Sequence, residues 1–120
     1  MRDLPKQVRR KLQDLCGLAY ERALARALAD LESQFHRWRS GEIDAYTLNE
    51  LVHKYHQGPS REVWKRYSDV SGGWTDLAVG TAVAEGLLQR EELPAEVLPY
   101  VERALEVRAV LQGRSGSPAA

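Results

Sequence analysis

A long stretch without helix breakers, from Leu4 to Arg39, limits what this chain can fold into. It contains one proline, Pro5, at its start and one glycine, Gly17. A proline is tolerated in a first helical turn, where its missing N–H is not needed. We therefore predict one long helix over this stretch, and about 35 residues at the α-helical rise span roughly 50 Å.

Apolar residues in this stretch recur at helical spacing in two series. The first series is Val8, Leu12, Leu15 and Ala19, and the second is Leu24, Leu28, Leu31, Phe35 and Trp38. Steps that alternate between three and four residues keep one face of a helix apolar, and the second series has the heptad spacing of helices packed lengthwise. The phase slips between the two series, so they do not form one continuous coiled-coil seam.

The length of this helix favours an oligomer. A compact domain of this chain's length is roughly 35 Å across, which is shorter than the helix. Either the helix bends near Gly17, or a second copy of the chain covers its apolar overhang, and we favour the second copy. The alanines at four-residue spacing either admit another helix closely or simply reflect the high helix propensity of alanine. The interface predicted for a homodimer is Ala19, Ala23, Leu24, Ala27, Leu28 and Leu31.

Turn-forming residues divide the next stretch into two shorter helices. Gly41 is expected to end the first helix in a left-handed conformation, and Asp44 to cap a second helix over residues 45–57. Gly58 ends that helix, and Ser60 is the expected cap of a short third helix.

A fourth helix is expected to begin at Thr75 as its cap and to run to about Gln89. Trp74 is placed to pack on Val79, as a hydrophobic staple at the helix start. The small residues Gly80, Ala82 and Gly86 predict a crowded helix that other helices approach from several sides.

The last predicted helix has Pro99 in its first turn and ends at Gly113, because a proline in the helix interior would break it. Residues 114–120 are predicted to form a disordered tail. No stretch has the alternating pattern of a strand. The prediction is therefore a single all-α domain over residues 1–113, with about five helices in a bundle organised on the long first helix.

Composition indicates an ordinary globular chain. Seventeen Lys and Arg balance seventeen Asp and Glu. No apolar run is long enough to cross a membrane, and the charged N-terminus does not resemble a secretion signal, so we expect a cytoplasmic protein without a membrane partner. Cys16 is the only cysteine, which excludes an internal disulfide. It lies among leucines and is expected to be a small buried apolar residue rather than a nucleophile.

Charge is distributed unevenly along the chain. Residues 1–39 hold nine Lys and Arg against five Asp and Glu, whereas residues 68–120 hold four against eight. Opposite charge favours docking of these two segments, within one chain or between chains. A nucleic-acid-binding domain is usually basic overall, and this chain is neutral.

A first candidate site is a metal centre built from two helices. Glu32 and His36 are four residues apart, Glu50 and His53 are three apart, and His56 follows one turn later. Di-iron bundles use a Glu-x-x-His pair from each of two helices, and this chain has one such pair. A dimer would double the number of ligands. The alternative is that these residues are solvated or lie at helix ends.

A second candidate is an anion site at the start of the third helix, formed by Ser60, Arg61 and Lys65. Free backbone N–H groups beside an arginine suit a phosphate or a carboxylate. The same residues also suit an ordinary cap and turn.

A third candidate is a nucleic-acid surface. Arg37, Trp38 and Arg39 alternate phosphate-binding and base-stacking groups. Arg9 and Arg10 near the N-terminus would add attraction that does not depend on nucleic-acid sequence.

We find no catalytic motif in the sequence, and no residue pattern indicates a bound cofactor. We find neither a Gly-x-Ser-x-Gly elbow nor a His-Glu-x-x-His zinc motif. The sequence therefore favours a non-enzymatic helical module that acts in protein interaction or regulation and pairs with itself or with another protein. The alternatives are a nucleic-acid-associated regulator and a helical bundle with a metal or small-ligand site.

Overall fold

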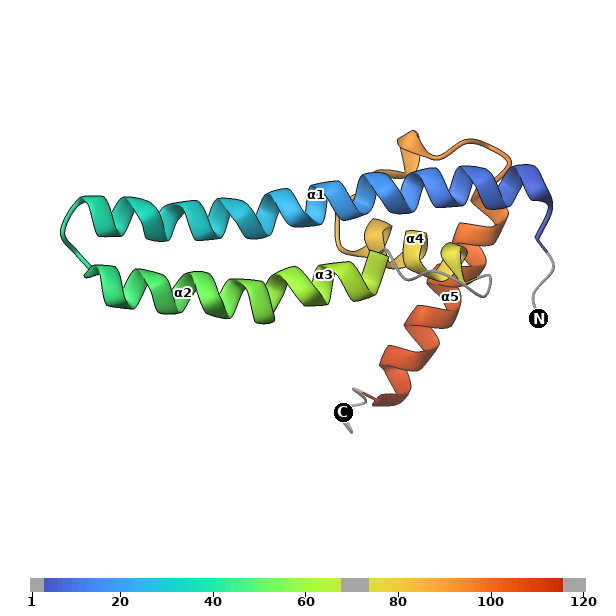
Figure 1. The fold of residues 1–120 in the computed structure, drawn as a ribbon. Coiled ribbons are helices and arrows are strands. Elements are labelled where there is room, and N and C mark those ends of the chain that lie inside the picture. Colours follow the sequence, from blue (N-terminus) through green and yellow to red (C-terminus); the bar gives the residue numbers. More distant parts are fainter. Residues whose placement is uncertain (1–3, 68–73, 116–120) are drawn as a thin grey trace. The chain divides into compact units, whose positions relative to one another are not determined.

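The computed structural model describes residues 4–67 and 74–115 (Figure 1). Their regular structure is entirely helical: α1 (Lys6–Arg39), α2 (Ala45–Gln57), α3 (Pro59–Tyr67), α4 (Thr75–Ala84), the short 3-10 helix η1 (Arg90–Glu92) and α5 (Leu98–Ser115). The all-α prediction is therefore confirmed for this part of the chain. Of the tail predicted over residues 114–120, the first two residues belong to α5 and the last five lie outside the described residues.

Contacts divide the chain into two compact units. We call Met1–Ala19 with Val70–Ala120 the terminal unit, and Tyr20–Asp69 the hairpin unit. Helix α1 contributes residues to both units and continues through Gly17 without a break. Whether the two units unfold together, as the single predicted domain requires, stays a prediction.

In the hairpin unit, α2 runs back along the second half of α1 (Figure 1). The turn between them is the predicted one. Gly41 has a φ of +82°, and its N–H donates a hydrogen bond to the Trp38 carbonyl at 3.0 Å. The Asp44 carboxylate then caps α2 by accepting from the Thr47 N–H at 2.8 Å. Both end signals in the sequence are thus confirmed.

Helices α2 and α3 meet at a single residue, Gly58. Its N–H donates to the Lys54 carbonyl at 2.8 Å, and its own carbonyl accepts from the Glu62 N–H at 2.9 Å. Pro59 is the first residue of α3, where a missing N–H costs little. The prediction that Ser60 caps α3 is therefore wrong, because this residue already lies inside the first turn.

The core of the terminal unit forms where α4 crosses α5. Its fully buried residues include Leu12, Val79, Leu88, Val97 and Val101. A Cβ atom at Gly80 would lie 3.0 Å from the Cβ of Ala104, so the two helices approach closely at this glycine. This contact agrees with the crowding that the small residues of α4 predict.

An ion pair links the basic first segment of the chain to the acidic last one within the terminal unit. Lys11 in α1 pairs with Glu96 in the connector before α5. The hydrogen bond from the Lys11 ammonium lowers the pKa of the Glu96 carboxyl. At least part of the opposed charge is therefore matched inside one chain.

Helix α4 is shorter than the sequence predicts, because it ends at Ala84 instead of near Gln89. Gly86 adopts a φ of +77°, and the Leu87 N–H bonds to the Ala82 carbonyl at 2.9 Å. This pattern is that of a glycine helix terminator. A glycine that we placed in the helix interior thus ends it.

The start of α4 also differs from the prediction. Trp74 is the N-cap, its own side chain makes no capping hydrogen bond, and Thr75 is the first residue of the helix. Thr75 is buried, so its side chain takes a place in the core instead of capping. Because Trp74 is itself the cap, it does not occupy the position before the cap from which a hydrophobic staple onto Val79 is made.

Helix α5 starts as predicted and ends later. Pro99 is its second residue, in the first turn, whereas Gly113 lies within the helix and does not end it.

In the part of the chain that the structure describes, no helix combines the length and the apolarity that crossing a membrane requires.

Candidate functional site

The hairpin unit leaves much of its apolar surface uncovered. Of its described apolar residues, only Ala23, Leu48 and Tyr67 are buried. On α1, in contrast, Leu28 is 49% exposed, and Phe35 and Trp38 are each 39% exposed. These three residues belong to the second heptad series, and we call them the α1 stripe. Two helices cover only part of one another, which leaves this stripe in contact with solvent.

The predicted dimer interface is partly used inside the chain. Ala19 and Ala23 are buried, and Leu24, Ala27 and Leu31 are partly buried. The alanines at positions 19 and 23 are thus buried in the single chain, and their part in an interface stays a prediction. Leu28 is the predicted interface residue that remains most accessible.

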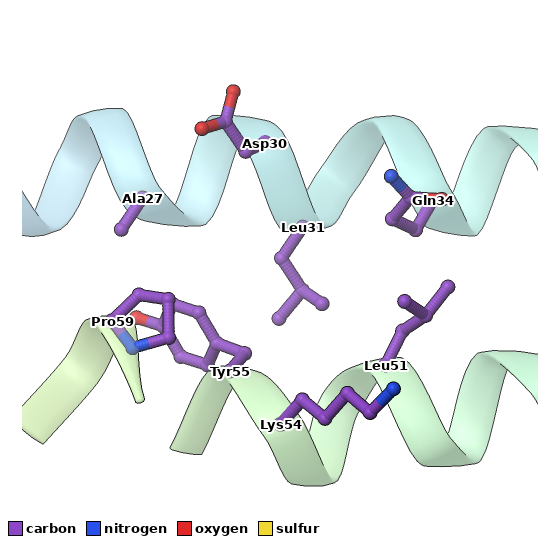
Figure 2. Close-up of a pocket in the computed structure, with 8 residues that line it drawn as sticks. All are labelled: Ala27, Asp30, Leu31, Gln34, Leu51, Lys54, Tyr55 and Pro59. Carbon is purple, nitrogen blue, oxygen red and sulfur yellow. The ribbon is translucent and has the colours of Figure 1, made fainter. Parts of the chain in front are cut away.

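An apolar groove of about 250 Å³ lies between α1 and α2. Figure 2 shows Leu31 of α1 and Leu51 of α2 pointing toward one another across it. The other lining residues are Ala27, Asp30, Gln34, Lys54, Tyr55 and Pro59. A groove of this size is smaller than most small-molecule pockets, which run from roughly 300 to 1,000 Å³.

A second, more polar cavity of about 430 Å³ lies elsewhere in the hairpin unit. It is lined by Tyr20 of α1, His56 and Gln57 at the end of α2, and Ser60, Arg61 and Trp64 of α3. Ser60 and Arg61 of the predicted anion site are therefore among the residues that line this cavity. Lys65, the third residue of that prediction, does not line it.

Three lining residues of this cavity were not anticipated as site residues: Tyr20, Gln57 and Trp64. The sequence did contain a signal for two of them, since His56, Ser60 and Trp64 are four residues apart, as are Gln57 and Arg61. Residues at this spacing line one side of a helix, and only Gly58 separates α2 from α3. Tyr20 comes from another helix, so no local pattern could indicate it.

The residues of the predicted metal centre are all exposed: Glu32, His36, Glu50, His53 and His56. Among the described residues, no three His, Cys, Asp or Glu side chains of one chain gather closely enough to hold a metal ion. A metal site would then need ligands from a second chain, and it stays a prediction.

The residues of the predicted nucleic-acid surface are exposed and fall in both units: Arg9 and Arg10 in the terminal unit, and Arg37, Trp38 and Arg39 in the hairpin unit. Three of these arginines already have partners, and the first is Arg9, whose guanidinium donates to the Leu4 carbonyl at 3.3 Å. The Arg37 guanidinium donates to Glu42 at 2.6 Å, and that of Arg39 lies 6.0 Å from the centre of the Trp38 ring. These contacts reduce what these side chains can offer to a phosphate.

Cys16 is buried in the terminal unit, and its thiol donates a weak hydrogen bond to the Thr75 carbonyl at 3.7 Å. Burial, with a smaller contribution from the Asp76 carboxylate, raises the pKa of this thiol from 9.0 to about 12. A neutral thiol is a poor nucleophile. The cysteine therefore packs as an apolar residue, as expected.

Comparisons with known proteins do not place the chain in a family. No protein-family model, curated protein or solved structure matches it.

Proposed function

We propose that this protein is a non-enzymatic protein-interaction module that pairs with a second copy of itself through the α1 stripe. The observation that carries the proposal is the exposure of Leu28, Phe35 and Trp38 on a hairpin whose described residues bury few apolar side chains. Removing such side chains from water is the dominant driving force in most protein association.

A second copy is the partner that the pattern of α1 fits best. The series from Leu24 to Trp38 follows the heptad spacing by which one helix packs lengthwise on another. Each copy presents the same surface, so pairing through a two-fold axis closes after two chains. Two helical hairpins would then form a four-helix bundle, an arrangement that buries an apolar seam between all four helices.

Charge along α1 supports an antiparallel arrangement of the two copies. Glu21 and Arg39 are both exposed and are eighteen residues apart, which is five helical turns, so they lie on one side of the helix. In an antiparallel pair whose midpoint is level with residue 30 along the helix axis, Glu21 of one copy would lie opposite Arg39 of the other. Opposite charges would then flank the segment that carries the α1 stripe, two turns before Leu28 and directly after Trp38.

Molar mass by light scattering tests the proposal. We expect a dimer for the wild type and a monomer for Leu28→Asp, because the variant would bury a carboxylate in the apolar seam. Leu111→Asp is the matched control, since Leu111 is 58% exposed on α5 in the other unit, and this variant should stay dimeric. Circular dichroism would verify that all three proteins keep their helix content.

Two results would overturn the proposal. One is a wild-type chain that remains monomeric at high protein concentration. The other is a Leu28→Asp variant that is folded and still dimeric, which would place any interface away from the α1 stripe.

The alternative role, a nucleic-acid-associated regulator, has less support, because Arg37 and Arg39 already contact Glu42 and Trp38. It requires binding to nucleic acid that weakens steeply as salt is added. A cytoplasmic location remains part of the main proposal.

A further inference from the structure

The polar cavity of the hairpin unit has the size of a small-molecule site. Its volume of about 430 Å³ falls within the range of roughly 300 to 1,000 Å³ that is usual for ligand pockets. All of its lining residues belong to one unit of one chain, so the cavity does not depend on the proposed dimer.

The polar side chains of the cavity favour an anion. Arg61, Ser60 and Gln57, whose side chains carry a guanidinium, a hydroxyl and an amide, are among its lining residues, and no Asp or Glu is. A guanidinium presents two parallel N–H donors that match two oxygens of a carboxylate or a phosphate. An oxyanion would therefore find donors in this cavity and no competing negative charge on its lining.

The aromatic side chains favour a flat ring beside that anion. Tyr20 lines the cavity from α1 and Trp64 from α3, and 49% of the surface of Trp64 is exposed. Aromatic rings favour offset-stacked or edge-to-face contact with a planar ring. The apolar and the anion-binding groups are thus present in the same cavity.

We propose that this cavity binds a small aromatic anion, that is, a planar ring that carries a phosphate or a carboxylate. Arg61 and Ser60 hold the oxyanion, and Trp64 stacks on the ring. A site for a small ligand goes beyond the proposed pairing of two chains.

Isothermal titration calorimetry on the full chain tests the site with four probes: phenyl phosphate, benzoate, inorganic phosphate and phenol. We expect saturable binding of phenyl phosphate or benzoate, tighter than that of inorganic phosphate and of phenol, because only the first two contain both the ring and the oxyanion. Which of the two binds more tightly identifies the oxyanion. Failure of both aromatic anions to saturate would overturn the proposal.

Two exposed cations on α3 make a matched pair of variants. Arg61→Gln should weaken binding of the aromatic anion by about tenfold or more, since a hydrogen bond to a charged group contributes roughly 1.5–3 kcal/mol. Lys65→Gln, which removes a positive charge just outside the lining, should change the affinity by about twofold or less, as expected of an exposed charge. Equal losses in the two variants would show diffuse charge attraction and would contradict a site.

Trp64→Ala separates the ring from the anion. It should weaken binding of phenyl phosphate or benzoate and leave the affinity for inorganic phosphate unchanged. An unchanged affinity for the aromatic anion would contradict the stacking role.

The titration should be repeated on Leu28→Asp, because binding to this variant is expected to persist whether or not the wild type is a dimer. The proposed site and the proposed interface therefore fail independently.

Discussion

Cys16 shows how the surroundings of one residue set its chemistry. Its thiol is buried, and its pKa is raised to about 12. Because the folded pKa lies above the ordinary value of 9.0, the neutral thiol contributes to stability fully below that value. That contribution is lost as the pH rises from 9.0 toward about 12.

We therefore expect Cys16 to react slowly with a disulfide reagent in the folded protein. At about pH 8 the rate should be at least about tenfold lower than in urea, since the thiolate is the reactive form and burial also blocks access. The unfolded chain is the internal control. Equal rates in the folded and unfolded protein would show that the thiol is accessible.

End signals at single residues were predictable only where they are purely local. Asp44 and Gly41 were identified correctly, because a cap and a left-handed glycine depend on the neighbouring backbone alone. Thr75 has the same local chemistry, but its side chain is buried in the core instead of capping α4. Packing against distant residues decided its role, and no neighbouring residue encodes that packing.

Helices α4 and α5 approach closely at Gly80, whose added Cβ would lie 3.0 Å from that of Ala104. We expect Gly80→Ala to lower the free energy of unfolding by about 1–3 kcal/mol, the usual cost of overpacking a core. Urea denaturation measures this loss. The neighbour is a short side chain on a helix and cannot rotate away, so the helices themselves must separate.

Gly17→Ala is the matched control for that change. Gly17 is also helical, but a Cβ there would meet no atom within 4 Å. Alanine is the better helix former by about 0.5–1 kcal/mol, so this variant should be more stable than the wild type. Destabilisation by both substitutions would mean that close packing at Gly80 is not the cause.

The lengths of the helices followed from sequence to different degrees. Helix α1 was predicted almost to the residue, because a long run without breakers leaves few alternatives. Helix α4 was predicted about five residues too long, since Gly86 is compatible both with a helix interior and with a helix end. The left-handed conformation that ends the helix at Gly86 lets the chain turn so that Leu87 and Leu88 are buried.

The pairing of two chains can be tested by exchanging the charges of Glu21 and Arg39, which flank the α1 stripe. Glu21→Arg and Arg39→Glu should each weaken the dimer, because each sets like charges opposite one another in the antiparallel arrangement. An exposed ion pair contributes about 0.2–1 kcal/mol, and a two-fold dimer holds two such pairs. Sedimentation equilibrium at low salt measures the dissociation constants.

The double variant with both substitutions is the control, since it restores opposite charges and should recover the wild-type affinity. Additive weakening in the double variant would contradict the antiparallel arrangement. Pairing through the α1 stripe would still be tested separately, by the molar mass of Leu28→Asp.

Local sequence was enough to predict three features: the all-helical class, the continuous first helix and the turn into α2. Helix-breaking residues, caps and apolar spacing act within a few residues, so they are visible in the sequence. The division into two units and the exposure of Leu28 could not be predicted in this way, since both depend on which helices pack together. The same holds for the polar cavity. Ser60 and Arg61 were predicted from the start of α3, whereas Tyr20 reaches the cavity from α1, far away in sequence. Side chains from separate helices come into contact only when the chain has folded. Local sequence patterns therefore do not indicate which of them will line the same cavity.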